Sequence, residues 1–322
     1  MIKLNKILEI KSLAEYIDVT DIPNDWITYY DAAFNSFNED WLNIDLEDLY
    51  SFYNFNEDLK DRITKEFTSL KKDINLNFLV YLWYFIMFKT SNSYKIVRWK
   101  NDMNYFTHHG SFMMPVIAFL MFYKEHDAIM KQLKFDDKQI QEHKKEIMLT
   151  CNRDKSRIGI DGVRFSQMIW ASRFMKCHII SVGVLQYELK TGFLNGEDVI
   201  FIHIPKDTSL KPKEVAKSLA EAPSLVKKYL QVENIKYVTE SWLLSPDIND
   251  ILSENSNIKQ FQKNFKILKE EDNIKDFLNF VFNVPLFKGE YSELESKTKL
   301  QKGLKEKLLN GKKLRIGLGI LK

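Results

Sequence analysis

Apolar residues in the first half of the chain return every three or four positions, which is the period of a helix that buries one face. Residues 73–89 are apolar nearly all round, as expected of a central helix. Pro23 is expected in a first helical turn, whereas Pro115 is expected to kink or interrupt its helix. The pattern predicts helices over 5–17, 26–37, 46–55, 59–70, 73–89, 101–123 and 125–150, the last as one helix or a pair. We therefore expect an all-helical N-terminal domain over residues 1–150.

The pattern changes after residue 150. A polar connection over 151–159 and a helix over 163–174 lead into segments rich in β-branched residues. Segments 178–189 and 198–204 flank a glycine-containing turn, which predicts an antiparallel hairpin. Further strands are expected over 237–244 and 314–321, with 265–268 and 277–282 as a candidate pair. Helices are expected over 213–229, 246–252, 256–265 and 298–309; a split of the first at Pro223 stays open, and Gly311 is expected to cap the last.

Composition narrows the function by exclusion. The 322 residues carry 47 Lys and Arg against 44 Asp and Glu, a net charge of +3, so no nucleic-acid partner is expected. The most apolar run, residues 78–88, is well short of the roughly 20 residues that cross a bilayer, so no membrane partner is expected. The N-terminus lacks the apolar core and cleavage site of a signal peptide, which points to the cytoplasm.

Metal and motif-marked chemistry find little support in the sequence. Cys151 and Cys177 lie in neither a CxxC motif nor a metal-ligand cluster, and buried thiols in a reducing cytosol explain them. His108 and His109 have no Cys or carboxylate at ligand spacing, so no metal is expected. There is no G-x-G-x-x-G, P-loop, G-x-S-x-G or H-E-x-x-H motif.

Three polar residues stand on the two hairpin strands. His203 lies near the end of its strand on the same face as Phe201; it could be a packed residue or a general base near pH 7. Gln186 and Glu188 share one face of the preceding strand. Glu188 could be a general base for an amine if burial raises its pKa, or part of a solvent-facing side or a salt bridge to Arg or Lys. The sequence alone leaves these alternatives open.

The segment after the second hairpin strand suits an anion. It holds Lys206, Thr208, Ser209, Lys211 and Lys213 just before and at the start of a predicted helix. Free N–H groups and the partial positive charge of a helix N-terminus favour phosphate, and lysines would add to this. A capped turn with ordinary surface lysines is the alternative.

Several sequence blocks in the C-terminal half resemble one bacterial family. They are 183–189 (GVLQYEL), 201–205 (FIHIP), 241–246 (SWLLSP), 256–265 and 298–301 (TKLQ), with Trp170 and Arg173 just ahead. In order and spacing they are similar to acyltransferase-domain-containing proteins, which join a helical N-acyltransferase N-terminal domain to a GNAT-like C-terminal domain. The resemblance covers residues 164–318, and the helical half fits in length and type.

The resemblance implies an α+β chain, with the helical domain over 1–150 followed over 151–322 by a GNAT-like mixed, mostly antiparallel sheet flanked by helices. Acyl-CoA would insert where the fourth strand, 199–205, parts from the fifth, 237–244. The loop 206–212 and the following helix would hold the pyrophosphate. The implied cofactor-binding residues are Ile204, Lys206, Thr208, Ser209, Lys211 and Lys213.

The implied activity is transfer of an acyl group, from acetyl-CoA or another acyl-CoA, to an amine of unknown identity. Candidates at predicted strand ends are Glu188 or His203 as base, Ser241 as acid for the leaving thiolate, and Gln186 and Trp242 as substrate contacts. The usual glycine-rich pyrophosphate loop is missing, because no glycine lies between Glu197 and Gly289. A second hypothesis therefore stays open: a non-catalytic GNAT-shaped binding or scaffold protein that does not use CoA, with Trp242 filling the gap.

Overall fold

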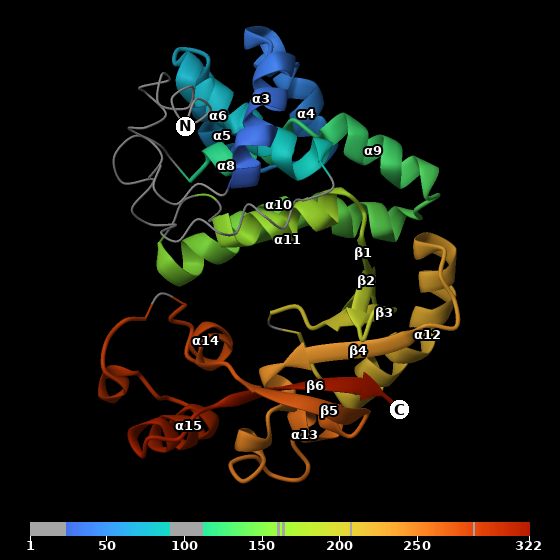
Figure 1. The fold of residues 1–322 in the computed structure, drawn as a ribbon, viewed down its shortest axis with the longest axis vertical. Coiled ribbons are helices and arrows are strands. Elements are labelled where there is room, and N and C mark those ends of the chain that lie inside the picture. The colour runs from blue at the N-terminus through green and yellow to red at the C-terminus, as the bar shows by residue number, and fades with distance from the viewer. Residues whose placement is uncertain (1–23, 91–111, 160–161, 163–164, 207, 286) are drawn as a thin grey trace. The chain divides into compact units, whose positions relative to one another are not determined.

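The chain divides into two compact units, Met1–Cys177 and His178–Lys322 (Figure 1). The computed structural model describes residues 24–90, 112–159, 162, 165–206, 208–285 and 287–322. The expected helix over 5–17 and the pair His108–His109 lie outside these residues. The described part confirms the expected α+β organisation, with helices first and a mostly antiparallel mixed sheet after them.

The N-terminal unit is helical, as its spacing of apolar residues predicts. Side-chain oxygens of Asp45, Asn56, Asp73 and Asp136 each accept backbone N–H bonds at a helix start, which fixes where these helices begin. The helical segments are α3 (Asn24–Ser36), η2 (Glu39–Leu42), α4 (Leu46–Tyr53), α5 (Glu57–Leu70), α6 (Ile74–Tyr84), η3 (Phe85–Lys89), α8 (Met114–Leu120), α9 (Tyr123–Gln132), α10 (Asp137–Ile158) and α11 (Phe165–Met175).

The core of this unit is built around α6 and α8. Leu79, Val80, Leu82 and Trp83 on α6 are at most 1% exposed, which confirms the prediction of a central helix. Pro115 does not kink a longer helix within the described residues. It stands in the first turn of α8, where its missing N–H would have no helical partner.

The N-terminal unit extends past the expected boundary at residue 150. That position falls inside α10, which runs unbroken to Ile158. α11 follows, and its Ala171 and Met175 are buried in the core of the same unit. Because α10 and α11 share this core, the unit continues as far as Cys177.

The C-terminal unit contains one six-stranded sheet in the order β1-β2-β3-β4-β6-β5. The expected hairpin is confirmed as β2 paired antiparallel with β3, but 178–189 is two strands rather than one. Gly183 makes the tight turn between them with φ +58, and an added Cβ there would lie 3.1 Å from that of Ser218. The strands are β1 (Ile179–Val182), β2 (Leu185–Leu194), β3 (Glu197–His203), β4 (Lys236–Ser241), β5 (Phe265–Asp272) and β6 (Arg315–Leu321).

Two other expectations for this unit are wrong. The strand expected over 237–244 ends at Ser241, whose hydroxyl caps the short helix η5 (Trp242–Leu244) by accepting the Leu243 N–H. Residues 277–282 do not form a strand. Asn273 caps α14 (Ile274–Asp276), and η7 (Phe277–Val281) continues it, because Phe277, Leu278 and Val281 are buried at helical spacing.

Helix α12 (Pro212–Leu230) covers one face of the sheet. It buries Val215, Ser218, Ala222, Val226 and Tyr229, which form a single stripe at helical spacing. The Ser218 hydroxyl donates to the Val182 carbonyl and meets the Tyr187 hydroxyl. Pro223 does not split the helix, because it lies on the exposed side.

The sheet face that carries Tyr187 therefore packs against α12, and the alternate residues of β2 face the other way. Helices α13 (Asn257–Gln262) and α15 (Lys299–Leu309) complete the unit, together with η6 (Pro246–Ile248) and η8 (Tyr291–Glu293). Thr298 and Gln301 form a capping box at the start of α15. At its end Asn310 is the C-cap, and Gly311 follows it with φ +74.

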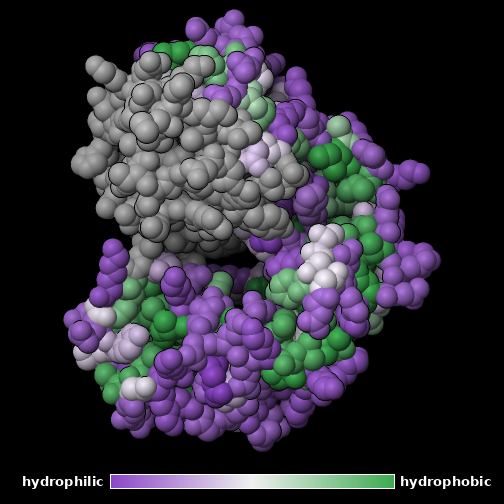
Figure 2. Space-filling view, in the orientation of Figure 1, coloured by the Kyte–Doolittle hydropathy of each residue, from purple (hydrophilic) through white to green (hydrophobic). Residues whose placement is uncertain are grey.

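The surface of the C-terminal unit is mainly hydrophilic in the view of Figure 2, with hydrophobic side chains in small groups. Among the helices of the described residues, none has the length and apolar character needed to cross a bilayer.

Candidate functional site

The candidate site is a buried carboxylate beside an imidazole on the hairpin strands. In the β2–β3 register, Gln186 lies opposite His203 and Glu188 lies opposite Phe201. Residues opposite each other in an antiparallel pair point to the same face, so all four share the face away from α12. His203 Nε2 lies 2.7 Å from Glu188 Oε2.

The two side chains of this pair differ in their exposure to solvent. The Glu188 side chain is 1% exposed, whereas that of His203 is 16% exposed. A carboxylate accepts hydrogen bonds, so it holds the imidazole in the tautomer that carries its proton on Nε2. The lone pair is then on Nδ1 of the more accessible ring. The geometry suits His203 as a base and Glu188 as the residue that orients it.

The surface beside the Glu188–His203 pair is apolar. The rings of Phe201 and His203 lie 4.9 Å apart, and Phe201 packs with the fully buried Val199 and Val238. Lys190 Nζ lies 3.5 Å from the centre of the Phe201 ring, a cation–π contact. Such a surface can hold an alkyl chain next to a few polar groups.

The parallel strands β3 and β4 stop pairing next to this apolar surface. Their ladder has three register pairs, of which the last joins Phe201 to Val238. Beyond it β4 continues to pair only with β6, on its other edge, and the Thr239 hydroxyl donates to the Ile202 carbonyl at 2.8 Å. Backbone groups of β4 beyond Val238 that face β3 thus lie outside the parallel ladder.

The predicted anion-binding residues follow His203 directly. Ile204, Lys206, Thr208 and Ser209 are partly buried in the loop that leads to α12, and the Thr208 N–H donates to the Pro205 carbonyl. Pro212 opens α12, and no side chain caps this helix start. Lys211 and Lys213 are exposed there.

The negative charge of Glu214 would repel an anion bound at the start of α12. Its carboxylate lies 3.6 Å from Lys211 Nζ, and it carries negative charge in the first helical turn. A bound phosphate would compete with it for Lys211.

Ser241 and Trp242 are not brought to the Glu188–His203 pair by the strand geometry. Alternation along β4 puts Ser241 with Thr239 and Tyr237, and Tyr237 contacts Tyr187 on the α12 face. The Trp242 ring packs against the cluster that contains Phe277, with ring centres 6.3 Å apart.

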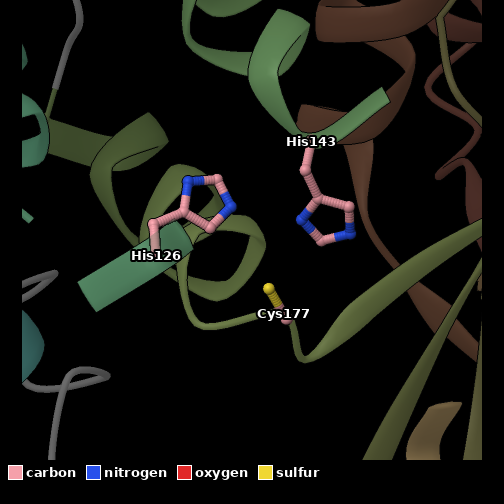
Figure 3. A group of neighbouring side chains, drawn as sticks. All are labelled: His126, His143 and Cys177. Atoms are coloured by element: carbon pink, nitrogen blue, oxygen red, sulfur yellow. The ribbon is translucent and has the colours of Figure 1, made fainter. Parts of the chain in front are cut away.

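A second group of reactive side chains lies in the N-terminal unit. His126 on α9, His143 on α10 and Cys177 after α11 are all buried, and one ligand atom of each lies within 4.8 Å of the others. Figure 3 shows the two rings side by side with the Cys177 sulfur directed toward the space between them. The sequence interpretation of Cys177 as lying outside any ligand cluster is therefore wrong, although both cysteines are buried, as expected, and neither forms a disulfide.

No short sequence motif predicts the group of His126, His143 and Cys177. His126 and His143 come from different helices and Cys177 from the turn after a third, and only the packing of these segments brings them together. The one usable signal is that His126 and His143 fall on the apolar faces of amphipathic helices.

The family model of the GNAT-like C-terminal domain matches residues 179–321, and this confirms the resemblance for the C-terminal unit. Among solved structures, an acyltransferase in complex with decanoyl-CoA has a TM-score of 0.70 at 20% identity, covering 85% of this chain and 86% of its own. A mutant acyltransferase in complex with octanoyl-CoA gives 0.71 at 18% identity, with 86% and 87% covered.

A third similar structure is an acyltransferase in complex with decanoyl-CoA and teicoplanin, with a TM-score of 0.66 at 19% identity, covering 86% of this chain and 87% of its own. At these identities the likenesses establish a shared fold. A search of curated protein sequences gives no significant match.

Proposed function

We propose that this chain, whose residues 179–321 form a GNAT-like C-terminal domain, is an acyl-CoA-dependent N-acyltransferase. The observation that carries the proposal is the 2.7 Å pair of Glu188 and His203 beside the point where the parallel ladder of β3 and β4 ends. The acyl-CoA complexes of proteins with this fold support acyl-CoA as the donor.

The chemistry assigns His203 as general base. The amine nitrogen would attack the thioester carbonyl carbon, and the proton displaced as the C–N bond forms would pass to His203 Nδ1. Collapse of the tetrahedral intermediate breaks the C–S bond, and the same proton would then pass to the CoA thiolate. Glu188 would hold the ring through both steps and stabilise the imidazolium. A backbone N–H of β4 beyond Val238 would polarise the carbonyl oxygen.

Other candidates take supporting roles in the proposal. Gln186, opposite His203 in the register, would contact the amine or the acyl carbonyl. Ser241 and Trp242 have weaker support, because strand alternation and packing turn them elsewhere. If Ser241 nevertheless protonates the thiolate, Ser241→Ala will slow transfer as strongly as loss of the base.

The donor's pyrophosphate would lie on the loop from Ile204 to Lys213. Lys206 and Lys211 would contribute charge, and Thr208, Ser209 and the start of α12 would contribute hydrogen bonds. The double variant Lys206→Ala with Lys211→Ala should weaken CoA binding at least tenfold. Lys217→Ala with Lys227→Ala removes equal charge from α12 outside the loop and is the matched control; it should leave binding within twofold.

The reaction is tested by following release of the free CoA thiol from acetyl-, octanoyl- and decanoyl-CoA with a panel of amines, teicoplanin included. Octanoyl and decanoyl donors are expected to be used, because the surface around Phe201 and Val238 is apolar. His203→Ala should lower the rate by about 10²–10⁴. Transfer that is as fast in His203→Ala as in the unchanged chain would refute His203 as the base.

One observation favours a second candidate function. The loop between β3 and α12 lacks glycine, which would let the backbone approach a pyrophosphate closely. A GNAT-shaped scaffold that binds no CoA would have this feature. Absence of binding to any CoA by the folded chain would favour it.

A further inference from the structure

We propose that His126, His143 and Cys177 form a binding site for one Zn²⁺ ion or a similar borderline-soft cation inside the N-terminal unit. The inference is independent of the acyltransferase proposal, because all three residues lie in the other compact unit. Two imidazoles and one thiolate are a ligand set that zinc accepts in proteins.

The distances fit a metal. The three ligand atoms lie within 4.8 Å of one another. Zinc bonds of about 2.0–2.3 Å place tetrahedral ligands roughly 3.3–3.7 Å apart, so side-chain rotations could close the group on an ion. A fourth ligand, a water or a nearby backbone carbonyl, would complete the coordination.

His126 is the ring that packing alone explains least. It is 0% exposed, and among the described residues neither of its ring nitrogens has a hydrogen-bond partner. A buried polar group without a partner carries a desolvation cost that a bound cation would remove.

The end of α11 brings the other two residues together. The carbonyl oxygen of Phe174 accepts the Cys177 N–H at 2.8 Å and a hydrogen bond from His143 Nδ1 at 3.0 Å. A metal on Nδ1 would replace this ring proton and shift it to Nε2, whereas a metal on Nε2 would leave the bond in place. Phe174 keeps the Cys177 N–H in both cases, so the turn that positions the thiol survives metal binding.

The backbone conformation of Cys177 also supports a binding role for its thiol. Its φ is +56, the left-handed conformation that commonly follows a helix and is usually taken by glycine. A cysteine is strained there, and strained positions often mark function. Its side chain, 2% exposed, is directed at the two rings, which gives the thiol a reason to occupy a glycine position.

The test uses the full chain prepared with zinc and dialysed, with metal content measured by mass spectrometry. About one equivalent is expected, and Cys177→Ser and His126→Gln should lose at least nine-tenths of it. Cys151→Ser is the matched control, since Cys151 is also buried and forms no disulfide, and it should keep the metal. A chelator should lower the Tm of the unchanged chain and of Cys151→Ser.

Cobalt provides a readout that needs no variant to fold. Titration of the chelator-treated chain with Co²⁺ should produce a near-ultraviolet thiolate-to-cobalt band and strong visible bands at one equivalent, because tetrahedral Co²⁺ mimics zinc. Metal content below about 0.1 equivalent, together with no cobalt band in the unchanged chain, would overturn the proposal and leave a packed His–His–Cys core.

Discussion

At the scale of single residues, burial separates the two members of the Glu188–His203 pair. The carboxylate is almost fully buried, and its hydrogen bond to Nε2 fixes the tautomer of the ring. The imidazole is the more exposed of the two side chains. A carboxylate that orients an imidazole is a recurrent way to build a base that works near neutral pH.

Glu188→Gln tests this division of work. Glutamine can still accept the His203 N–H, so the fold should hold, but the negative charge that stabilises the imidazolium is gone. We expect kcat to fall about 10–10³-fold, less than in His203→Ala, with KM for the amine little changed. Steady-state kinetics of both variants check the order. A larger loss in Glu188→Gln than in His203→Ala would make Glu188 the base.

Asp276 offers a residue-scale test of electrostatics. Burial and the charge of Glu240 raise its pKa above the ordinary value. A carboxyl whose pKa is raised by folding opposes stability once it ionises, so its cost grows as pH rises through that range. Asp276→Asn should therefore raise Tm at pH 7 by about 2 °C or less, with a smaller difference at acid pH. A lower Tm for the variant at pH 7 would contradict the sign.

At the scale of elements, glycines in β6 let the sheet and η5 approach. An added Cβ at Gly317 would lie 2.6 Å from the Leu244 carbonyl oxygen. The short helix after β4 therefore lies directly against β6, beside the end of the strand that carries Ser241.

Gly317→Ala should destabilise the C-terminal unit by about 1–3 kcal/mol, because the backbone of η5 would have to move. Gly192→Ala is a suitable comparison: nothing lies within 4 Å of its Cβ position, so it pays only for its φ of +63, about 1 kcal/mol. Denaturant unfolding of both checks the difference. Equal losses of stability in the two variants would mean that the close approach of Leu244 does not set the cost of Gly317→Ala.

A second element-scale contact joins η6 to β6. Arg315 bonds Asp247 through its guanidinium and through its backbone N–H, which lies 2.8 Å from Oδ2. Burial alone would raise the pKa of Asp247, but these bonds and the charge of Arg315 outweigh it and lower the pKa. The contribution to stability is present above the ordinary carboxyl pKa and is lost as pH falls through the lowered one.

Asp247→Asn should therefore cost about 1–3 kcal/mol at pH 7, the usual loss for a charged hydrogen-bond partner. The gap from the unchanged chain should narrow steadily below pH 4, where the unchanged chain loses the same contact. Urea unfolding at several pH values measures it. A gap that stays constant down to pH 2 would show that charge is not involved.

At the scale of the whole molecule, sequence patterns predicted the classes of element and the residues that face together. Alternation put His203 with Phe201 and Gln186 with Glu188, but only the β2–β3 register brings the two strands' polar residues into contact. Residues 277–282 were predicted as a strand because short apolar runs do not distinguish strand from helix. The His126–His143–Cys177 group could not be predicted, because helix packing rather than spacing creates it.

The central claim of the proposed function is that the C-terminal unit binds an acyl-CoA donor. Calorimetric titration of the full chain with decanoyl-CoA, beside acetyl-CoA and free CoA, tests it most directly. We predict one site of micromolar Kd, tighter for decanoyl-CoA than for free CoA, and weakened at least tenfold by Lys206→Ala with Lys211→Ala but not by Lys217→Ala with Lys227→Ala. No heat of binding with any of the three ligands, from a chain shown to be folded, would contradict the acyltransferase account.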